Sequence, residues 1–308
     1  MKKLIVVGNV YFDHNIYGIE LDIHANLQTG TEYRADSGEI VIGGSAVNVA
    51  MQATKLEMGV SFIGKVGDDE FGLEIKKLFE KKNIDSSLLT KSEFSTSISV
   101  NLIFKKDGDF VGAHYGEASK HLNPSDFDFN HPLLVEGGLI YFGGTAKQPL
   151  LFQSLPTLFA KLKKIGFTIF FDPNRLPVGK EIESREQIAK ALPYVDYYLP
   201  NETEILQFAN SKNLDNALEA TLKYGAKNII VKTGPKGCRV KTNKIDITID
   251  GEKIIPINTV GAGDSFNAAL ISQLANGADL ESAAKFANKC ASIKVSDNIW
   301  PTKKEVNL

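Results

Sequence analysis

One segment carries the strongest structural signal in this chain: Asn258-Thr259-Val260-Gly261-Ala262-Gly263-Asp264-Ser265-Phe266-Asn267. Its two glycines lead into an apolar helical face that closes at Gly277. The N–H groups of Gly261, Ala262 and Gly263 would lie at the helix N-terminus, where partial positive charge favours an anion. Asp264 beside them is either a helix cap or a functional carboxylate. A cap alone does not require two glycines, whose missing Cβ lets a ligand approach the backbone closely.

Outward from this segment, short apolar runs of strand length alternate with longer amphipathic helical patterns. Strands are predicted at 4–7, 60–63, 168–171 and 228–231, and helices at 71–79 and 155–165, the last stopped by Gly166. Near-continuous apolar strands between amphipathic helices are typical of a mostly parallel sheet that helices cover on both faces. The sequence therefore predicts an α/β fold. A single domain over 1–308 is expected, because no repeat, low-complexity tract or linker marks a boundary.

Two β-rich segments interrupt that alternation. Residues 96–104 alternate apolar and polar side chains, and residues 109–115 follow a predicted tight turn at Asp107-Gly108, which is typical of a hairpin. Residues 11–42 also lack helical periodicity. Insertions at about 11–42 and 95–116 therefore predict a small β-sheet that projects from the main domain.

The composition is that of a soluble globular protein, with 43% hydrophobic and 23% charged residues. The 35 Lys and Arg residues and 37 Asp and Glu residues give a formal net charge of −2, so no general attraction to nucleic acid or anionic lipid is expected. No apolar run approaches the roughly 20 residues of a membrane helix. Cys238 and Cys290 match no metal or redox spacing, which suits a reduced cytoplasm. We therefore expect a cytoplasmic protein without nucleic-acid or membrane partners.

One segment superficially matches a phosphate-binding P-loop: Gly59-Val60-Ser61-Phe62-Ile63-Gly64-Lys65-Val66. It lacks the final Ser or Thr whose hydroxyl would hold Mg²⁺. The residues between its glycines also have the pattern of a strand. We interpret the segment as a strand and not as a P-loop.

Three further clusters place polar groups where a predicted strand or turn meets the next element. In Ile42-Gly43-Gly44-Ser45-Ala46-Val47-Asn48, paired glycines precede a predicted helix. The Asn48 amide could bind hydroxyl groups as both hydrogen-bond donor and acceptor. Asn201 and Glu204 share one helical face, where they could order waters around Mg²⁺. In Val231-Lys232-Thr233-Gly234-Pro235-Lys236-Gly237, a strand runs into a glycine turn. Taken singly, an ordinary strand–helix joint, a helix cap and a hairpin explain these clusters better.

Together and in this order, these segments resemble the ribokinase-like sugar kinases, also called the phosphofructokinase-B group. The resemblance extends from Val6 to about Val306 and rests on seven short motifs. They are Gly8-Asn9-Val10-Tyr11-Phe12-Asp13; Gly43-Gly44-x-x-x-Asn48; Ile63-Gly64-Lys65-Val66-Gly67-Asp68-Asp69-Glu70-Phe71-Gly72; Phe171-Asp172-Pro173-Asn174; Asn201-x-x-Glu204; Lys232-Thr233-Gly234 with Gly237; and Gly261-Ala262-Gly263-Asp264. Each motif is weak alone, but seven in family order over one chain are highly specific.

The resemblance implies a three-layer α/β/α ribokinase-like fold whose small β-sheet closes over the substrate as a lid, and lids of this kind often pair in a homodimer. It implies an ATP- and Mg²⁺-dependent kinase that phosphorylates a hydroxymethyl group of a small carbohydrate, with Asp264 as general base. Gly261, Ala262 and Gly263 would form an anion hole for the transferring phosphate. Substrate hydroxyls would be held by Asp13, Gly43, Gly44 and Asn48. The nucleotide site would comprise Asn201, Lys232, Thr233, Gly234, Gly237, Gly263 and Asn288, and Asn201 and Glu204 would hold Mg²⁺ through water.

Two departures from the family pattern bear on a monovalent cation. Members activated by K⁺ usually carry Asp where this chain has Asn258, and their last loop has a Gly-Ala segment that is shortened here at 295–301. Both changes weaken the case for a monovalent-cation site, so little dependence on K⁺ is expected. Ser45-Ala46-Val47 also replaces the Lys-Gly pair of typical ribokinases, so the sugar need not be ribose. The same segment offers no basic residue for a phosphorylated sugar.

Two other functions remain open on the sequence. A nucleoside kinase would use the same catalytic parts and would need a slot for the base, which Tyr11, Phe12, Phe110 and Tyr115 could supply. A non-catalytic sugar-binding or regulatory relative would need neither Asp264 with its glycines nor the Asn201 and Glu204 pair, and this chain has them all.

Overall fold

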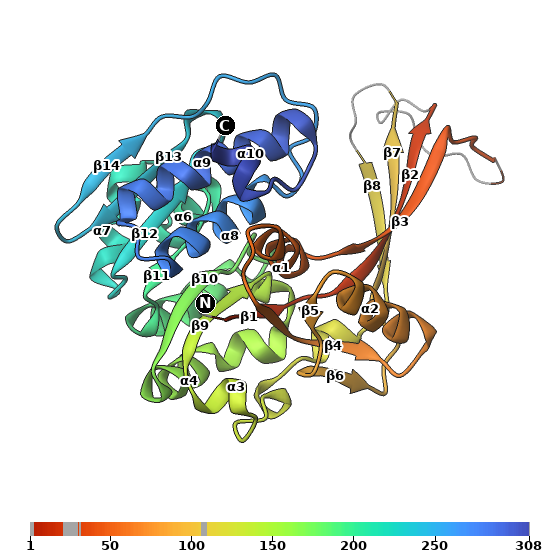
Figure 1. The fold of residues 1–308 in the computed structure, drawn as a ribbon, viewed down its shortest axis with the longest axis horizontal. Helices are drawn as coiled ribbons and strands as arrows, with labels where there is room; N and C mark the ends of the chain where they lie inside the picture. Colours follow the sequence, from red (N-terminus) through yellow and green to blue (C-terminus); the bar gives the residue numbers. More distant parts are fainter. Residues whose placement is uncertain (1–2, 21–29, 31, 106–109, 308) are drawn as a thin grey trace.

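The computed structural model describes residues 3–20, 30, 32–105 and 110–307 (Figure 1). The strands of the larger sheet are β1 (Leu4–Gly8), β4 (Val60–Gly67), β5 (Ile84–Asp85), β6 (Leu89–Ser92), β9 (Gly138–Gly143), β10 (Phe167–Asp172), β11 (Tyr197–Tyr198), β12 (Asn228–Lys232), β13 (Cys238–Thr242) and β14 (Asp246–Ile249). The helices are α1 (Ser45–Lys55), α2 (Glu70–Lys81), α3 (Pro132–Val135), α4 (Pro149–Ile165), α5 (Glu181–Ala191), α6 (Glu202–Ala209), α7 (Leu214–Lys223), α8 (Ala262–Ala275), α9 (Leu280–Asp297) and α10 (Lys303–Asn307). The predicted strands and both predicted helices are confirmed.

The larger sheet is mostly parallel, as predicted. Its strand order is β14-β13-β12-β11-β10-β9-β1-β4-β5, and β6 pairs with β4. The pairings from β12 through β1 to β5 are parallel, and β13 and β14 form an antiparallel edge. Parallel strands end at one edge of a sheet, so the loops that follow β1, β9, β10 and β12 meet there. That edge carries the polar residues described below.

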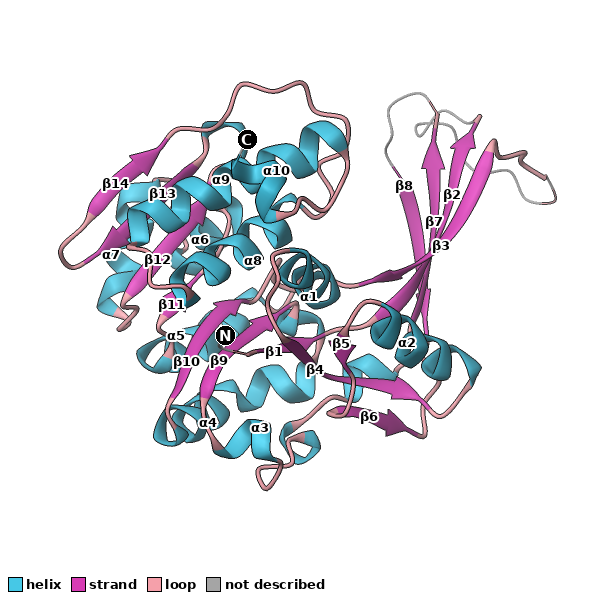
Figure 2. Ribbon diagram, in the orientation of Figure 1, coloured by secondary structure: helices cyan, strands magenta, loops and turns pink. Residues whose placement is uncertain are grey.

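Helices cover both faces of this sheet (Figure 2). Leu4 and Val6 of β1 face a core that contains α1, α2, α8 and α9, whereas Ile5 and Val7 face a second core that contains α3 to α7. This alternation is the period-two pattern of a strand buried on both sides. Across the described part of the chain, no helix is both long enough and apolar enough to traverse a bilayer.

Local sequence signals explain where several elements begin and end. The carboxylate of Asp69 accepts a hydrogen bond from Gly72 N at 2.8 Å and so caps α2. Gly166 ends α4 with a φ of 105°, a left-handed conformation that glycine adopts without steric cost. The segment that superficially matches a P-loop is strand β4, as interpreted from its pattern.

A separate four-stranded sheet extends away from the larger one (Figure 1). It is formed by β3 (Ser37–Gly43), β2 (Tyr11–Ile19), β7 (Ile98–Phe104) and β8 (Phe110–Tyr115), in that order. β2 pairs antiparallel with β3 and parallel with β7, and β7 pairs antiparallel with β8. The predicted turn at Asp107-Gly108 and part of the predicted insertion 11–42 lie outside the described residues.

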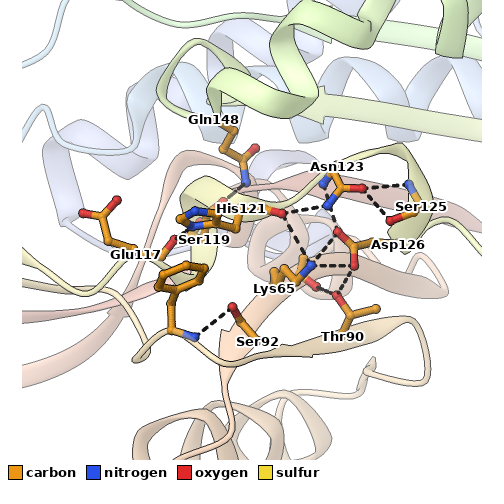
Figure 3. A network of polar contacts seen from close by, with 12 residues as sticks. Lys65, Thr90, Ser92, Glu117, Ser119, His121, Asn123, Ser125, Asp126 and Gln148 are labelled. Atoms are coloured by element: carbon orange, nitrogen blue, oxygen red, sulfur yellow. Dashed lines mark hydrogen bonds and ion pairs between the residues drawn. The ribbon is translucent and has the colours of Figure 1, made fainter.

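A network of polar side chains links the edge of the larger sheet to the segment that follows β8 (Figure 3). Lys65 of β4 forms an ion pair with Asp126 at 2.8 Å, and the two side chains are only 13% and 10% exposed. The second oxygen of Asp126 accepts a hydrogen bond from Asn123 N at 2.9 Å. Nearby, Ser119 Oγ accepts a hydrogen bond from Val10 N at 3.3 Å, which ties the same segment to the end of β1. The network therefore ties the segment that follows β8 to the larger sheet.

We expect Asp126→Ala to lower the free energy of unfolding by about 3–5 kcal/mol, because it leaves the buried Lys65 ammonium without its counter-charge. The matched control is Asp68→Ala. Asp68 pairs with Lys91 at 2.6 Å, but these side chains are 70% and 72% exposed, so a loss of about 0–1 kcal/mol is expected. Urea unfolding of the three proteins measures both losses. Equal losses in the two variants would contradict a stabilising role for the network.

Candidate active site

Asp264 lies in the first turn of α8 and is held by two donors from α1. Ser45 Oγ donates to Asp264 Oδ1 at 2.6 Å, and Asn48 Nδ2 donates to Asp264 Oδ2 at 2.8 Å. The residue is buried, and burial raises the pKa of Asp264 to about 6, although both hydrogen bonds oppose that rise. The structure thus brings the predicted residues Asp264 and Asn48 into direct contact.

The paired glycines before α1 allow the backbone to pass close to polar groups. Gly44 has a φ of 116°, and a Cβ there would lie 2.5 Å from Asn9 O. A Cβ on Gly43 would overlap the carboxylate of Asp13 on β2. Burial raises the pKa of Tyr11, and the charges of Asp13 and Asp264 raise it further, so both carboxylates lie near this phenol. Gly43 and Gly44 thus directly precede Ser45, which binds Asp264, and Asp13 lies against Gly43.

A buried ion pair lies next to this cluster. Lys232 Nζ at the end of β12 contacts Asp172 Oδ2 at the end of β10 at 2.6 Å, with side chains 13% and 1% exposed. Asn267 of α8 donates to the same Asp172 oxygen at 2.7 Å, and its own oxygen accepts from Lys232 Nζ at 3.3 Å. Burial alone would lower the pKa of Lys232, but the nearby carboxylates of Asp172 and Glu204 raise it above its ordinary value. The ammonium is therefore held in its charged form.

Asn201 and Glu204 form a reciprocal capping box at the start of α6. Glu204 N donates to Asn201 Oδ1 at 2.9 Å, and Asn201 N donates to Glu204 Oε2 at 2.8 Å. The helix-cap interpretation is thus present in the structure. It uses Oε2 of Glu204 and leaves Oε1 for other partners. Burial and the charge of Asp172 raise the pKa of Glu204.

The glycine-rich turn before α8 faces the Lys232 ammonium. Gly261 has a φ of 80°, and a Cβ on Gly263 would lie 3.6 Å from Lys232 Nζ. Ala262 N donates to Thr259 O at 3.2 Å, so this amide has an internal partner. Gly263 and Asp264 follow in the first turn, whose N–H groups have no partner within the helix. Helix N-terminus and ammonium together make this corner electropositive.

The other residues predicted for a nucleotide site lie around the β12–β13 turn. Thr233 N donates to Gly237 O at 2.9 Å, and Gly237 has a φ of 96°, which favours glycine. Gly234 lies in the same turn with a φ of 62°. Asn288 of α9 donates to the backbone oxygens of Ile249 and Asp250 at 3.3 and 3.1 Å, so here it holds the end of β14.

A cavity of about 900 Å³ adjoins Tyr11 between the smaller sheet and the main domain. Asn9 and Tyr11 line it from the β1–β2 junction, and Tyr115 lines it from β8. Lys147 and Arg175 also line it, and neither residue belongs to a motif that marks it in the sequence. Phe12, one of the aromatic residues considered for a base slot, is instead buried against Phe71 at a ring distance of 5.8 Å. The Phe110 side chain lies outside the described residues.

Three polar residues of this site carried no predicted role. Ser45 belongs to the Gly43–Asn48 motif, and its place three residues before Asn48 puts both on one helical face. Asp172 belongs to the Phe171–Asn174 motif, and Asn267 lies three residues after Asp264. Within the described ranges, no group of three or more His, Cys, Asp or Glu side chains is arranged to hold a bare metal ion. A divalent cation bound through water at Glu204 is compatible with that arrangement.

The sequence matches the model of one protein family, described as pfkB family carbohydrate kinase, over residues 1–298. This chain belongs to that family. It is therefore a phosphotransferase that acts on a carbohydrate alcohol group.

Individual relatives of this carbohydrate kinase agree with that assignment. This chain is 28% identical over 270 residues to the Arabidopsis thaliana protein named "Probable fructokinase-7". The aligned region covers 83% of this chain and 78% of the relative. Its fold matches the structure of Thermotoga maritima ribokinase with a TM-score of 0.81, at 23% identity over 100% of this chain and 98% of the other. It also matches Vibrio cholerae fructokinase bound to fructose, ADP and calcium, with a TM-score of 0.79 at 21% identity over 100% and 98% of the two chains. The predicted ribokinase-like fold is confirmed.

The hydrogen bond from Ser45 stabilises the charged form of Asp264, so Ser45→Ala should raise the pKa of Asp264 above its present value of about 6. A hydrogen bond to a charged group contributes about 1.5–3 kcal/mol, so the proton affinity of the carboxylate should rise about tenfold or more. The carboxyl ¹³C shift of Asp264, assigned with Asp264→Asn, measures this by NMR titration. An unchanged titration would mean that the Ser45 hydroxyl does not stabilise the carboxylate in solution.

Proposed function

We propose that this carbohydrate kinase transfers the γ-phosphate of ATP to a hydroxymethyl group of a small free sugar, with Asp264 as the general base. The supporting observation is the buried Asp264 carboxylate, fixed by Ser45 and Asn48 beside the N-terminus of α8. Its pKa of about 6 lies close to neutrality, where a general base is both ionised and able to accept a proton. The hydroxyl proton passes to Asp264, the sugar oxygen bonds to the γ-phosphorus, and ADP leaves with the electron pair of the broken P–O bond.

The transferring phosphate would lie against the Gly261–Asp264 turn. This corner combines helix N–H groups with the Lys232 ammonium, and phosphoryl transfer depends mainly on positioning and charge stabilisation. The adjoining residues Asn201, Thr233, Gly234, Gly237 and Asn288 would bind the nucleotide. Mg²⁺ supplies charge neutralisation when bound, and Asn201 with Glu204 would hold it through water, because Glu204 keeps one carboxylate oxygen outside the capping box.

The smaller sheet would act as a lid over the sugar. Its β8 strand contributes Tyr115 to the cavity, whereas Ala146 and Leu176 line the cavity from the main domain. Asp13, also on the smaller sheet, lies against Gly43 and would bind a sugar hydroxyl. Closure of such a lid excludes water that would otherwise accept the phosphoryl group.

The acceptor is best sought among free sugars, with fructose and ribose first, since relatives carry these names or ligands. Sugar acids should be tested as acceptors too, because the positive charges of Lys147 and Arg175 in the cavity wall would attract a carboxylate. Nucleosides test the alternative of a nucleoside kinase, because the aromatic side chains of Tyr11, Tyr115 and Phe152 line the cavity. ADP release with each acceptor identifies the substrate class, and phosphorylation of nucleosides alone would overturn the sugar assignment.

Asp264→Ala should lower kcat by about 10²–10⁴, the range of general-base catalysis, while calorimetry still detects ATP and sugar binding. For the wild type, kcat/KM should fall as the pH drops below about 6, because the protonated carboxyl cannot accept a proton. Asp264→Asn preserves the shape of the side chain and should be equally slow. The control is Asp215→Ala, which removes a 71% exposed carboxylate. Turnover near the wild-type rate in both Asp264 variants would refute the assignment.

Glu204→Gln should raise the Mg²⁺ concentration needed for half-maximal rate severalfold, because an amide orders metal-bound water less well than a carboxylate. Initial rates across a Mg²⁺ titration at fixed ATP measure this. Glu202→Gln, one residue into the same helix, is the matched control. An identical Mg²⁺ titration for Glu204→Gln and wild type would leave Glu204 with only its capping role.

A further inference from the structure

Lys294 is a buried cation that the proposed mechanism does not use. It lies in the last turn of α9 and is 5% exposed. Its Nζ donates to Asn298 Oδ1 at 3.0 Å and lies 5.0 Å from the centre of the Trp300 ring. Among the residues that the structure describes, no carboxylate lies within ion-pair distance of this ammonium. Lysines are rarely buried without a counter-charge, so this one calls for an explanation.

The position of Lys294 connects it to the glycine turn before α8. A Cβ on Gly261 would lie 3.6 Å from Lys294 Cε and 2.8 Å from Trp300 Cη2. The lysine stem and the indole therefore pack directly against the turn that leads to Asp264. Gly261 is required at this point both by its left-handed φ of 80° and by this close approach.

A chain of hydrogen bonds extends from the ammonium to the backbone of the same turn. Asn298 Oδ1, which accepts from Lys294, also accepts from Asn258 Nδ2 at 3.1 Å. Asn258 Oδ1 in turn accepts from Val260 N at 2.9 Å. Val295 O, one residue beyond Lys294, accepts from Asn258 N at 3.2 Å. The ammonium is thus the cationic end of a network that fixes residues 258–260.

We propose that Lys294 is a positioning residue for phosphoryl transfer: its ammonium serves as a fixed cation that holds the Asn258–Gly261 turn and adds positive charge behind the α8 N-terminus. The proposal rests on the proposed location of the transferring phosphate at that terminus. A buried charge is screened less than an exposed one, so a tethered ammonium strengthens the electropositive corner without any bound ion. Burial lowers the pKa of Lys294, and an incoming phosphate would oppose that effect, since an opposite charge favours the ammonium.

A purely structural role predicts different behaviour. Lysine near a helix C-terminus interacts favourably with the helix dipole, and here it also holds the Asn298 cap. In that case its loss would lower stability and would not affect the chemical step selectively. A measurement that separates charge from packing therefore decides between the two roles.

The test variant is Lys294→Met, which keeps the apolar stem against Trp300 and removes the charge. We expect kcat to fall about 10–100-fold, less than the roughly 10²–10³-fold loss when a group in direct contact with the transition-state charge is removed, with KM for the sugar changed less than threefold. Ethylammonium, NH₄⁺ or K⁺ at constant ionic strength should restore part of the rate in the variant and leave the wild type unchanged. The matched control is Lys285→Met on the same helix, whose side chain is 61% exposed and paired with Glu281.

An unchanged kcat in Lys294→Met would overturn the proposal, and so would a loss that no cation relieves and that accompanies a lower melting temperature. If Lys294→Met does not fold, Lys294→Arg and Lys294→Gln decide: the charged variant should keep most of the activity and the neutral one should not, and equal activities would overturn the proposal. Full activity in Asp264→Ala would refute the proposed base and with it the reaction geometry on which the role of Lys294 depends. An inactive Asp264→Ala beside an unaffected Lys294→Met would refute only the role of Lys294.

Discussion

The buried ion pair between Lys232 and Asp172 is the interaction on which the site geometry depends. It joins the ends of β12 and β10, two strands that β11 separates, and Asn267 extends it to α8. Asn267 and Asp264 are three residues apart, so they lie on one face of the helix. Fixing Asn267 against the sheet therefore fixes the rotation of α8 and with it the direction of the Asp264 carboxylate. The same pair places the ammonium beside the glycine turn.

The charge balance of the site explains the altered acidities of its carboxyl groups. Asp172, Asp264 and Glu204 gather around Lys232, and burial with mutual repulsion raises the pKa of both Asp264 and Glu204. Such a site gains stability from additional positive charge and tolerates further negative charge only when a cation accompanies it. ATP bound together with Mg²⁺ would satisfy that requirement.

Local signals in the sequence predicted most of the fold and the turns at which the candidate site lies. Apolar runs located β1, β4, β10 and β12, and the glycine turn located the start of α8, because these features depend on residues close together in the chain. The contacts of Ser45, Asp172 and Asn267 depend on segments far apart in sequence, which no local pattern reveals. The family pattern places a loop at 295–301, but α9 continues to Asp297, and the packing of Lys294 against Gly261 likewise joins residues far apart in the sequence.

The central position of β1 has a consequence for the way the chain is made. β1 pairs on one side with β4 and on the other with β9, which begins at Gly138. At the roughly 5–20 residues per second of synthesis, β9 emerges about 6–30 s after β1. During that interval an entirely apolar strand has one unpaired edge and no completed layer on one face. The nascent chain therefore exposes an apolar strand edge that can pair with another chain until β9 is available.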